Sequence, residues 1–209
     1  NINTAGATIF DDQVGNSAAL TSLMTDVDGT TEVNGGTITT TGGQTFHDIV
    51  SLGASVVFTS TTVDDITFDQ TLTGGTGMTI LISSTNDVIF KDAVSTDGAV
   101  TVTADSDISG TGNISMETGS SLDAGTGTIN IDGANVLTRS LTTTNGTASA
   151  ITIDAHNGNV ITRDNGVNAL GDITVNATGS ITLEDNGVNT GEGGSVNVQA
   201  DGDVISTGS

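Results

Sequence analysis

SAITIDA (149–155) returns 22 residues later as GDITVNA (171–177). In both stretches apolar and polar residues alternate, which is typical of a strand with one buried face. GTINIDG (127–133) and GSVNVQA (194–200) repeat the pattern on either side, with the same spacing to within one residue. The leading apolar residues of these four strands are Ile129, Ile151, Ile173 and Val196.

A second pattern, in the N-terminal half, has the same period. Phe46, Phe68 and Phe90 begin FHDIV, FDQTL and FKDAV, and each lies 22 residues after the one before. Phe10 begins FDDQV, 36 residues before Phe46, and we assign it to the same position in the repeat. Residues one period apart become vertical neighbours, about 4.8 Å apart, when coils of a chain stack. The sequence therefore predicts one ladder of phenylalanines and one of isoleucine and valine.

A period between 20 and 50 residues indicates a repeat architecture, and about 22 residues is too short for a propeller blade. We predict an all-β chain folded as a parallel β-helix (β-solenoid) with about 22 residues and two or three short strands per coil, two of which the sequence patterns locate. Residues 1–209 form one such segment, without recognisable caps. The longer step from Val100 to Ile129 predicts an irregular or looped region around 105–128. An antiparallel β-sandwich is the alternative, but it explains the alternation and not the constant register.

Composition limits the function. Lys91, Arg139 and Arg163 oppose 25 acidic residues, which gives a net charge of −22. Nucleic-acid binding is excluded because phosphates require clustered Lys and Arg. We expect no membrane insertion, because no run of apolar residues is long enough to span a bilayer. The chain has no cysteine, so it uses neither disulfides nor thiol chemistry.

Several stretches carry a family resemblance: GGTITTTGG (35–43), FHDIV (46–50), VSLGASVVFTSTTV (50–63) and GDITVNATGSITL (171–183). With them the chain resembles the repeats of filamentous-haemagglutinin-like bacterial surface adhesins. The resemblance covers nearly the whole chain and is clearer at 1–100 and 149–209 than at 105–128. It implies a right-handed β-solenoid that serves as an extracellular or cell-surface shaft in bacteria, and it transfers no catalytic residue.

DNGVN (164–168) recurs at 185–189, and it raises the question of a metal site. If the two copies stack, Asp164 lies about 4.8 Å above or below Asp185. Two exposed carboxylates at that distance repel by about 1 kcal/mol in water. They therefore either face water or share a weakly bound calcium ion, and Arg163 is placed to offset their charge. We expect Asn-Gly to make the bend, and no other cofactor.

We expect no enzymatic activity. His47 and His156 have no nucleophile beside them in the sequence, so we interpret both as surface histidines. Two alternatives stay open: a glycan-binding or polysaccharide-cleaving β-helix, and an ice-binding solenoid. The second rests on TIT (37–39), TST (59–61) and TVT (101–103), but TILIS (79–83) interrupts the threonine ladder.

The sequence thus predicts a structural segment of an extracellular fibre or adhesin shaft. Its expected partners are other copies of itself, joined end to end or laterally, or adjoining repeats of a longer chain. A surface glycan is a further expected partner.

Overall fold

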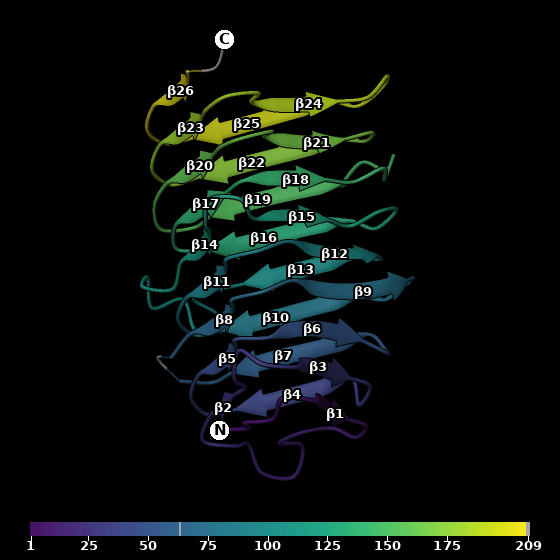
Figure 1. Cartoon of the computed structure of the whole chain (residues 1–209). Coiled ribbons are helices and arrows are strands. Elements are labelled where there is room, and N and C mark those ends of the chain that lie inside the picture. The colour runs from purple at the N-terminus through teal and green to yellow at the C-terminus, as the bar shows by residue number, and fades with distance from the viewer. Residues whose placement is uncertain (63, 208–209) are drawn as a thin grey trace.

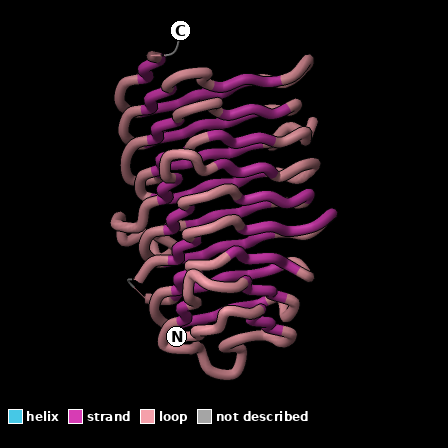
Figure 2. Tube along the Cα trace, viewed as in Figure 1, coloured by secondary structure: helices cyan, strands magenta, loops and turns pink. Residues whose placement is uncertain are grey.

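The computed structural model describes residues 1–62 and 64–207, and Val63, Gly208 and Ser209 of the predicted segment lie outside the described residues. The described residues form 26 strands and no helix. The chain winds in successive coils from the N-terminus at one end to the C-terminus at the other (Figure 1). Each coil consists of short strands joined by turns and loops (Figure 2). No helix in the described part is long and apolar enough to cross a membrane.

The strands form three parallel sheets of nine, eight and nine strands. Sheet 1 contains β1 (Ala7–Phe10), β3 (Thr30–Val33), β6 (Ile49–Leu52), β9 (Leu72–Thr76), β12 (Val94–Asp97), β15 (Ser121–Asp123), β18 (Ser140–Thr142), β21 (Val167–Ala169) and β24 (Val188–Thr190). Sheet 2 contains β4 (Thr37–Thr40), β7 (Val56–Ser60), β10 (Ile80–Ser84), β13 (Val100–Thr103), β16 (Ile129–Gly133), β19 (Ile151–Ala155), β22 (Ile173–Ala177) and β25 (Val196–Ala200). Sheet 3 contains β2 (Leu23–Met24), β5 (Gln44–Phe46), β8 (Ile66–Phe68), β11 (Val88–Phe90), β14 (Ile114–Met116), β17 (Val136–Thr138), β20 (Val160–Thr162), β23 (Ile181–Leu183) and β26 (Val204–Ser206).

The strand order confirms the predicted parallel β-solenoid. Except for β1 and β3, which are two elements apart, neighbouring strands in each sheet are three elements apart in the sequence, so one full coil separates them. Of the two or three strands per coil that the sequence allowed, three are present, because each complete coil contributes one strand to each of the three sheets; the sequence patterns located only two of them. The missed strands are those of sheet 1, such as β21, which buries only Val167 and Ala169. A strand with two inward residues is too short to show a period in the sequence.

The isoleucine and valine ladder lies in sheet 2. Ile129 pairs with Ile151, Ile151 with Ile173, and Ile173 with Val196. β-branched side chains suit these stacked, pleated faces. The longer spacing between repeats also falls in sheet 2, since Val100 pairs with Ile129. The additional residues form a loop between β13 and β14, which lies within the region predicted to be irregular.

Phenylalanine rings fill the core between sheets 2 and 3. Phe68 stacks on Phe46 at a centroid distance of 5.1 Å and on Phe90 at 5.8 Å. Phe58, from β7 of sheet 2, meets Phe46 and Phe68 edge-on at 5.5 and 5.2 Å. These offset-stacked and edge-on arrangements are favourable between aromatic rings. All four rings are fully buried.

Phe10 does not join this stack, and its predicted assignment is wrong. It ends β1 and pairs with Val33, so it lies in sheet 1, whereas Phe46 lies in sheet 3. The reason is the irregular segment that follows β1. Val14 and Leu20 make only isolated bridges to sheet 2, and the coil count of the regular repeats does not apply there.

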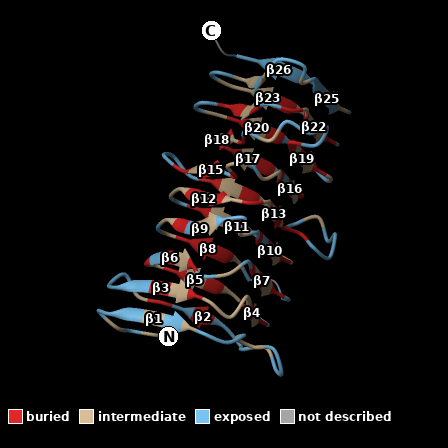
Figure 3. Ribbon diagram, turned by 90° about the vertical axis from the view of Figure 1, so that its right-hand side faces the viewer, coloured by how far each residue is buried: buried red, intermediate tan, exposed pale blue. Residues whose placement is uncertain are grey.

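Burial follows the axis of the solenoid and decreases at its ends (Figure 3). Inward residues of the middle coils are fully buried, but in the coil that holds β25 and β26 they are not. Val196 is 44% exposed and Val204 is 54% exposed. The outer edges of β24, β25 and β26 pair with no further strand among the described residues.

Candidate functional site

The two DNGVN copies form the same corner of successive coils, between sheets 3 and 1. Val167 pairs with Val188 just after the corner. The left-handed backbone positions are Asp164 (φ 60°), Asp185 (φ 55°) and the glycines two residues later. The bend is therefore made by Asp and Gly rather than by Asn-Gly, since Asp is one of the few side chains that tolerate this region.

The two carboxylates at this corner have protein partners. The backbone N–H of Asp164 donates a hydrogen bond to Asp185 Oδ2 at 3.0 Å. Arg139 Nη1 lies 3.5 Å from Asp164 Oδ2, whereas Arg163 pairs with Glu184 at 2.9 Å. The charge near Asp164 is thus offset by Arg139, not by Arg163 as the sequence suggested. Within residues 1–62 and 64–207, no three His, Cys, Asp or Glu side chains are arranged to hold a metal ion. A calcium ion shared by the Asp164–Asp185 pair stays a prediction.

A column of charged residues directly follows the strands of sheet 3, and we name it the charge column. The backbone N–H of Asp69 donates to Phe46 O, and that of Lys91 donates to Phe68 O, so each residue extends the parallel ladder by one position. The column contains every Lys and Arg of the chain. Its members are His47, Asp69, Lys91, Glu117, Arg139, Arg163 and Glu184.

Contacts along the charge column join neighbouring coils. Asp69 accepts from His47 on one side and lies 2.8 Å from Lys91 Nζ on the other. Burial raises the pKa of Asp69, but the hydrogen bonds from Lys91 and His47 outweigh it and bring the pKa below its ordinary value. The sequence carried a signal that we missed: one charged or titratable residue follows each stacked phenylalanine.

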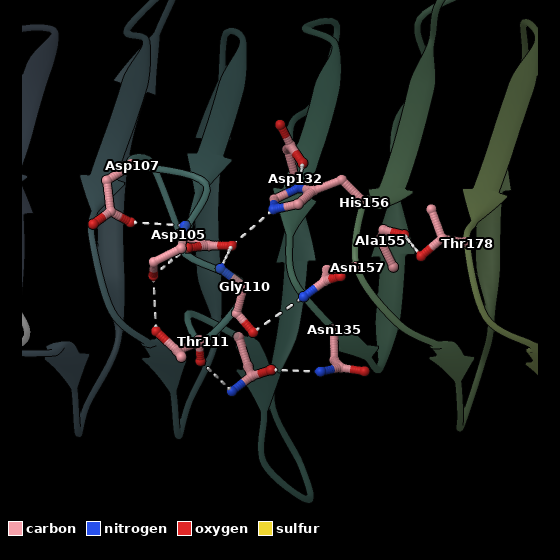
Figure 4. A network of polar contacts seen from close by, with 12 residues as sticks. Asp105, Asp107, Gly110, Thr111, Asp132, Asn135, Ala155, His156, Asn157 and Thr178 are labelled. Atoms are coloured by element: carbon pink, nitrogen blue, oxygen red, sulfur yellow. Dashed lines mark hydrogen bonds and ion pairs between the residues drawn. The ribbon is translucent and has the colours of Figure 1, made fainter.

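His156 is the centre of a second polar network (Figure 4). It follows β19, and its Nδ1 lies 2.7 Å from Asp132 Oδ1 of β16. Its Nε2 lies 2.9 Å from Asp105 Oδ2, in the loop at residues 105–113 that leads from β13 to β14. We name this loop the strap. His156 is thus bonded to two carboxylates, which the sequence did not indicate.

Asp105 anchors the strap from within. It is 1% exposed and has a left-handed backbone with φ 58°. Ser109 Oγ donates to its Oδ1 at 2.9 Å, and the backbone N–H of Gly110 donates to its Oδ2 at 2.8 Å. Burial raises the pKa of Asp105, but these bonds and the one to His156 outweigh it and lower the pKa to about 2. Asp105 is therefore a carboxylate at all ordinary pH values.

A small cavity of about 260 Å³ lies beside the strap. It is bounded by Asp132 and Asp154, which are vertical neighbours in sheet 2, and by His156. Burial raises the pKa of Asp154, and the neighbouring charge of Asp132 raises it further. The only advance signal for this cluster was the 29-residue step from Val100 to Ile129, which supplies the residues of the strap.

The outer face of sheet 2 bears on the ice-binding alternative. Thr39, Thr59, Ser83 and Thr103 are successive partners in one outward column. In the adjacent outward column Thr37 pairs with Val57. TST (59–61) is therefore not aligned with TIT (37–39), because only its first threonine occupies a shared position. The continuation of the first column is Asp132, Asp154, Asn176 and Gln199.

The β-solenoid architecture expected from the resemblance is present, whereas adhesin identity and right-handed winding stay predictions. Comparison with known proteins finds no match to this chain, neither a family model, nor a curated protein, nor a solved structure.

Proposed function

We propose that this chain is a structural segment of an extracellular bacterial fibre or adhesin shaft. The observation that carries the proposal is the continuity of the three parallel sheets, which extend through all coils of the described chain. Each coil is hydrogen-bonded to the next on all three faces, and its inward side chains continue the same core. An assembly in which each repeat contacts only its neighbours gains length by adding repeats.

The distribution of charge supports a role as a spacer. All Lys and Arg side chains belong to the charge column and make contacts between coils, so the rest of the surface, apart from His156, is acidic or neutral. A net charge of −22 makes parallel shafts repel one another and keeps them apart in solution.

The proposal extends to contacts at the ends. The outer edges of β24, β25 and β26 present unpaired backbone groups and half-exposed Val196 and Val204. Unpaired strand edges are templates for further pairing. A second copy of this chain, or adjoining repeats of a longer chain, would continue the three sheets and cover these residues.

Electron microscopy of the isolated chain at low and high salt tests this proposal. We expect rods or filaments with a repeat of about 4.8 Å along their axis. They should lengthen as salt increases, because salt screens the repulsion between acidic subunits. Compact round particles under all conditions would contradict a shaft.

The second candidate is a glycan-binding or polysaccharide-cleaving β-helix. It is favoured by the Asp132–Asp154 pair beside His156, because a carboxyl group whose pKa is raised, as that of Asp154 is, can act as an acid on a glycosidic bond beside a second carboxyl group. Incubation with neutral and anionic polysaccharides separates the two functions. Product formation that is lost in Asp154→Asn would overturn the structural proposal.

A further inference from the structure

The strap connects parts of the chain that are far apart in sequence. Asp105 lies just beyond β13, and it contacts His156, just beyond β19 and 51 residues later. In sheet 2 the order is β13, β16 and β19, so the contact passes over one intervening coil. The strap therefore reaches across two coil steps, about 10 Å along the axis. Most other contacts between side chains join adjacent coils only.

The geometry of His156 determines its protonation state. Both ring nitrogens face carboxylate oxygens, Asp132 Oδ1 at 2.7 Å and Asp105 Oδ2 at 2.9 Å. An ionised carboxylate can only accept a hydrogen bond, so both nitrogens have to donate. Neutral imidazole has one N–H, whereas imidazolium has two. The contact as it stands therefore requires a protonated His156.

We propose that the strap is a proton-controlled clamp, fastened to β16 and β19 while His156 is protonated and released from His156 when the ring becomes neutral. In the neutral state one ring nitrogen would turn a lone pair towards a carboxylate oxygen at hydrogen-bond distance. Nδ1 lies nearer to its carboxylate and keeps its proton, so the bond that is lost is the one from Nε2 to Asp105 Oδ2. The bonds from Ser109 and Gly110 to Asp105 lie within the strap and remain in either state.

The titratable groups around His156 are all acidic. Asp105 belongs to the strap, Asp132 to β16 and Asp154 to β19. Asp107, also in the strap, accepts the backbone N–H of Ser109. In the next coil, Asn176 of β22 pairs with Asp154, and Thr178, just beyond β22, donates from Oγ1 to Ala155 O; neither side chain titrates.

Burial lowers the pKa of His156, but the hydrogen bonds to Asp105 and Asp132 outweigh it and raise the pKa above its ordinary value of 6.5. Because the pKa of His156 is raised in the folded chain, the stability that its protonated ring contributes is fully present below about pH 6.5. This stability is lost as the pH rises through the pKa of the folded chain. The lowered pKa of Asp105 sets the acidic limit, because the stability that its carboxylate contributes is lost as the pH falls towards about 2. The clamp is closed between these limits.

Loss of the contact to His156 frees only the middle of the strap. The backbone N–H of Ser106 donates to Ser84 O, and that of Ala134 donates to Gly112 O, and neither bond depends on a titrating group. The two ends of the strap therefore stay attached. Gly110 O also accepts from Asn157 Nδ2 at 3.3 Å, which does not titrate, so we expect motion at residues 107–109. Ile108 lies within this stretch and is 79% exposed, so a probe there reports on the motion without disturbing the core.

A spin label tests the clamp. Because the chain has no cysteine, Ile108→Cys gives a single attachment site for a nitroxide. Its electron paramagnetic resonance spectrum is recorded from about pH 5 to about pH 9, where histidine changes charge. We expect a shift from an immobile to a mobile spectrum, with a midpoint above 6.5, the ordinary pKa of histidine. A spectrum that does not change over this range would overturn the proposal.

Two variants separate a proton-controlled clamp from a purely structural loop. In Asp132→Asn the new amide can donate to neutral Nδ1 while Nε2 donates to Asp105, so the label should stay immobile at high pH. In His156→Gln both donors are on a single nitrogen, which does not span the two carboxylates as Nδ1 and Nε2 do, so the label should be mobile at every pH. His47→Gln is the matched control, and it should behave like the unmodified chain because His47 contacts Asp69 and not the strap.

The Asp132→Asn result decides the matter even if His156→Gln folds poorly. A label that becomes mobile at the same pH in Asp132→Asn as in the unmodified chain would contradict the proposal. The same holds for a transition that persists in folded His156→Gln. Circular dichroism of each variant establishes that the β-solenoid is intact before the spectra are compared.

Discussion

Replacement of Phe68 by alanine lowers the free energy of unfolding by about 4 kcal/mol, the largest effect that we expect of a single core substitution here. Phe68 is 1% exposed and contacts three other rings, those of Phe46, Phe58 and Phe90. Truncation removes these contacts and leaves a cavity at the centre of the stack, between coils that cannot close without breaking their backbone register. Denaturant titration followed by circular dichroism measures the loss.

Phe10→Ala is the matched control for this prediction. Phe10 begins a similar FDxx sequence, but it is only partly buried and lies in sheet 1, outside the stack. We expect its truncation to cost less than half as much as that of Phe68. Equal losses at the two positions would show that the phenylalanine stack has no special part in stability.

Gly166→Ala is expected to lower the free energy of unfolding by about 3 kcal/mol. Gly166 has φ 68°, a conformation that costs a side chain about 1–2 kcal/mol. A Cβ at this position would also lie 2.0 Å from the carbonyl oxygen of Gly187 in the next coil. The backbone of Gly187 cannot move aside as a flexible side chain can. Overpacking of this kind costs about 1–3 kcal/mol more.

Gly187→Ala provides the control, since the same motif recurs there and no coil lies above it among the described residues. Gly187 has φ 63°, but a Cβ would meet nothing within 4 Å. It should therefore show only the conformational cost, about 1–2 kcal/mol. The difference between the two variants, measured by thermal or denaturant unfolding, isolates the contact between stacked corners. Identical losses would mean that the two DNGVN corners do not stack.

The period and the fold class could be predicted from the sequence because the same inward positions recur coil after coil. Ile129, Ile151 and Ile173 keep one register, and so do Phe46, Phe68 and Phe90. Each repeat adds an independent observation of the same geometry. Phe10 was misassigned because the first coil is irregular, and a spacing of 36 residues has no fixed meaning there.

The functional features were harder to predict, for a physical reason. The contact between His156 and Asp105 depends on how far an inserted loop reaches over the neighbouring coil, and no period encodes this distance. The charge column could have been found, since His47, Asp69 and Lys91 follow the stacked phenylalanines one by one. The partner of Asp164 could not, because Arg139 and Arg163 occupy the same position of the repeat and only side-chain direction distinguishes them.

The central claim is that the chain is a rod of stacked coils. Residues that are further apart in the sequence by whole coils therefore lie further apart along the axis. It is tested most directly by pulsed electron paramagnetic resonance between nitroxides on one outward column of sheet 2. Thr39, Asp154 and Gln199 belong to this column, with the last two separated from Thr39 by five and seven coil steps. At about 4.8 Å per step, the account predicts separations of about 24 Å for Thr39–Asp154 and about 34 Å for Thr39–Gln199. A Thr39–Gln199 separation equal to or shorter than that of Thr39–Asp154 would contradict the stacked solenoid.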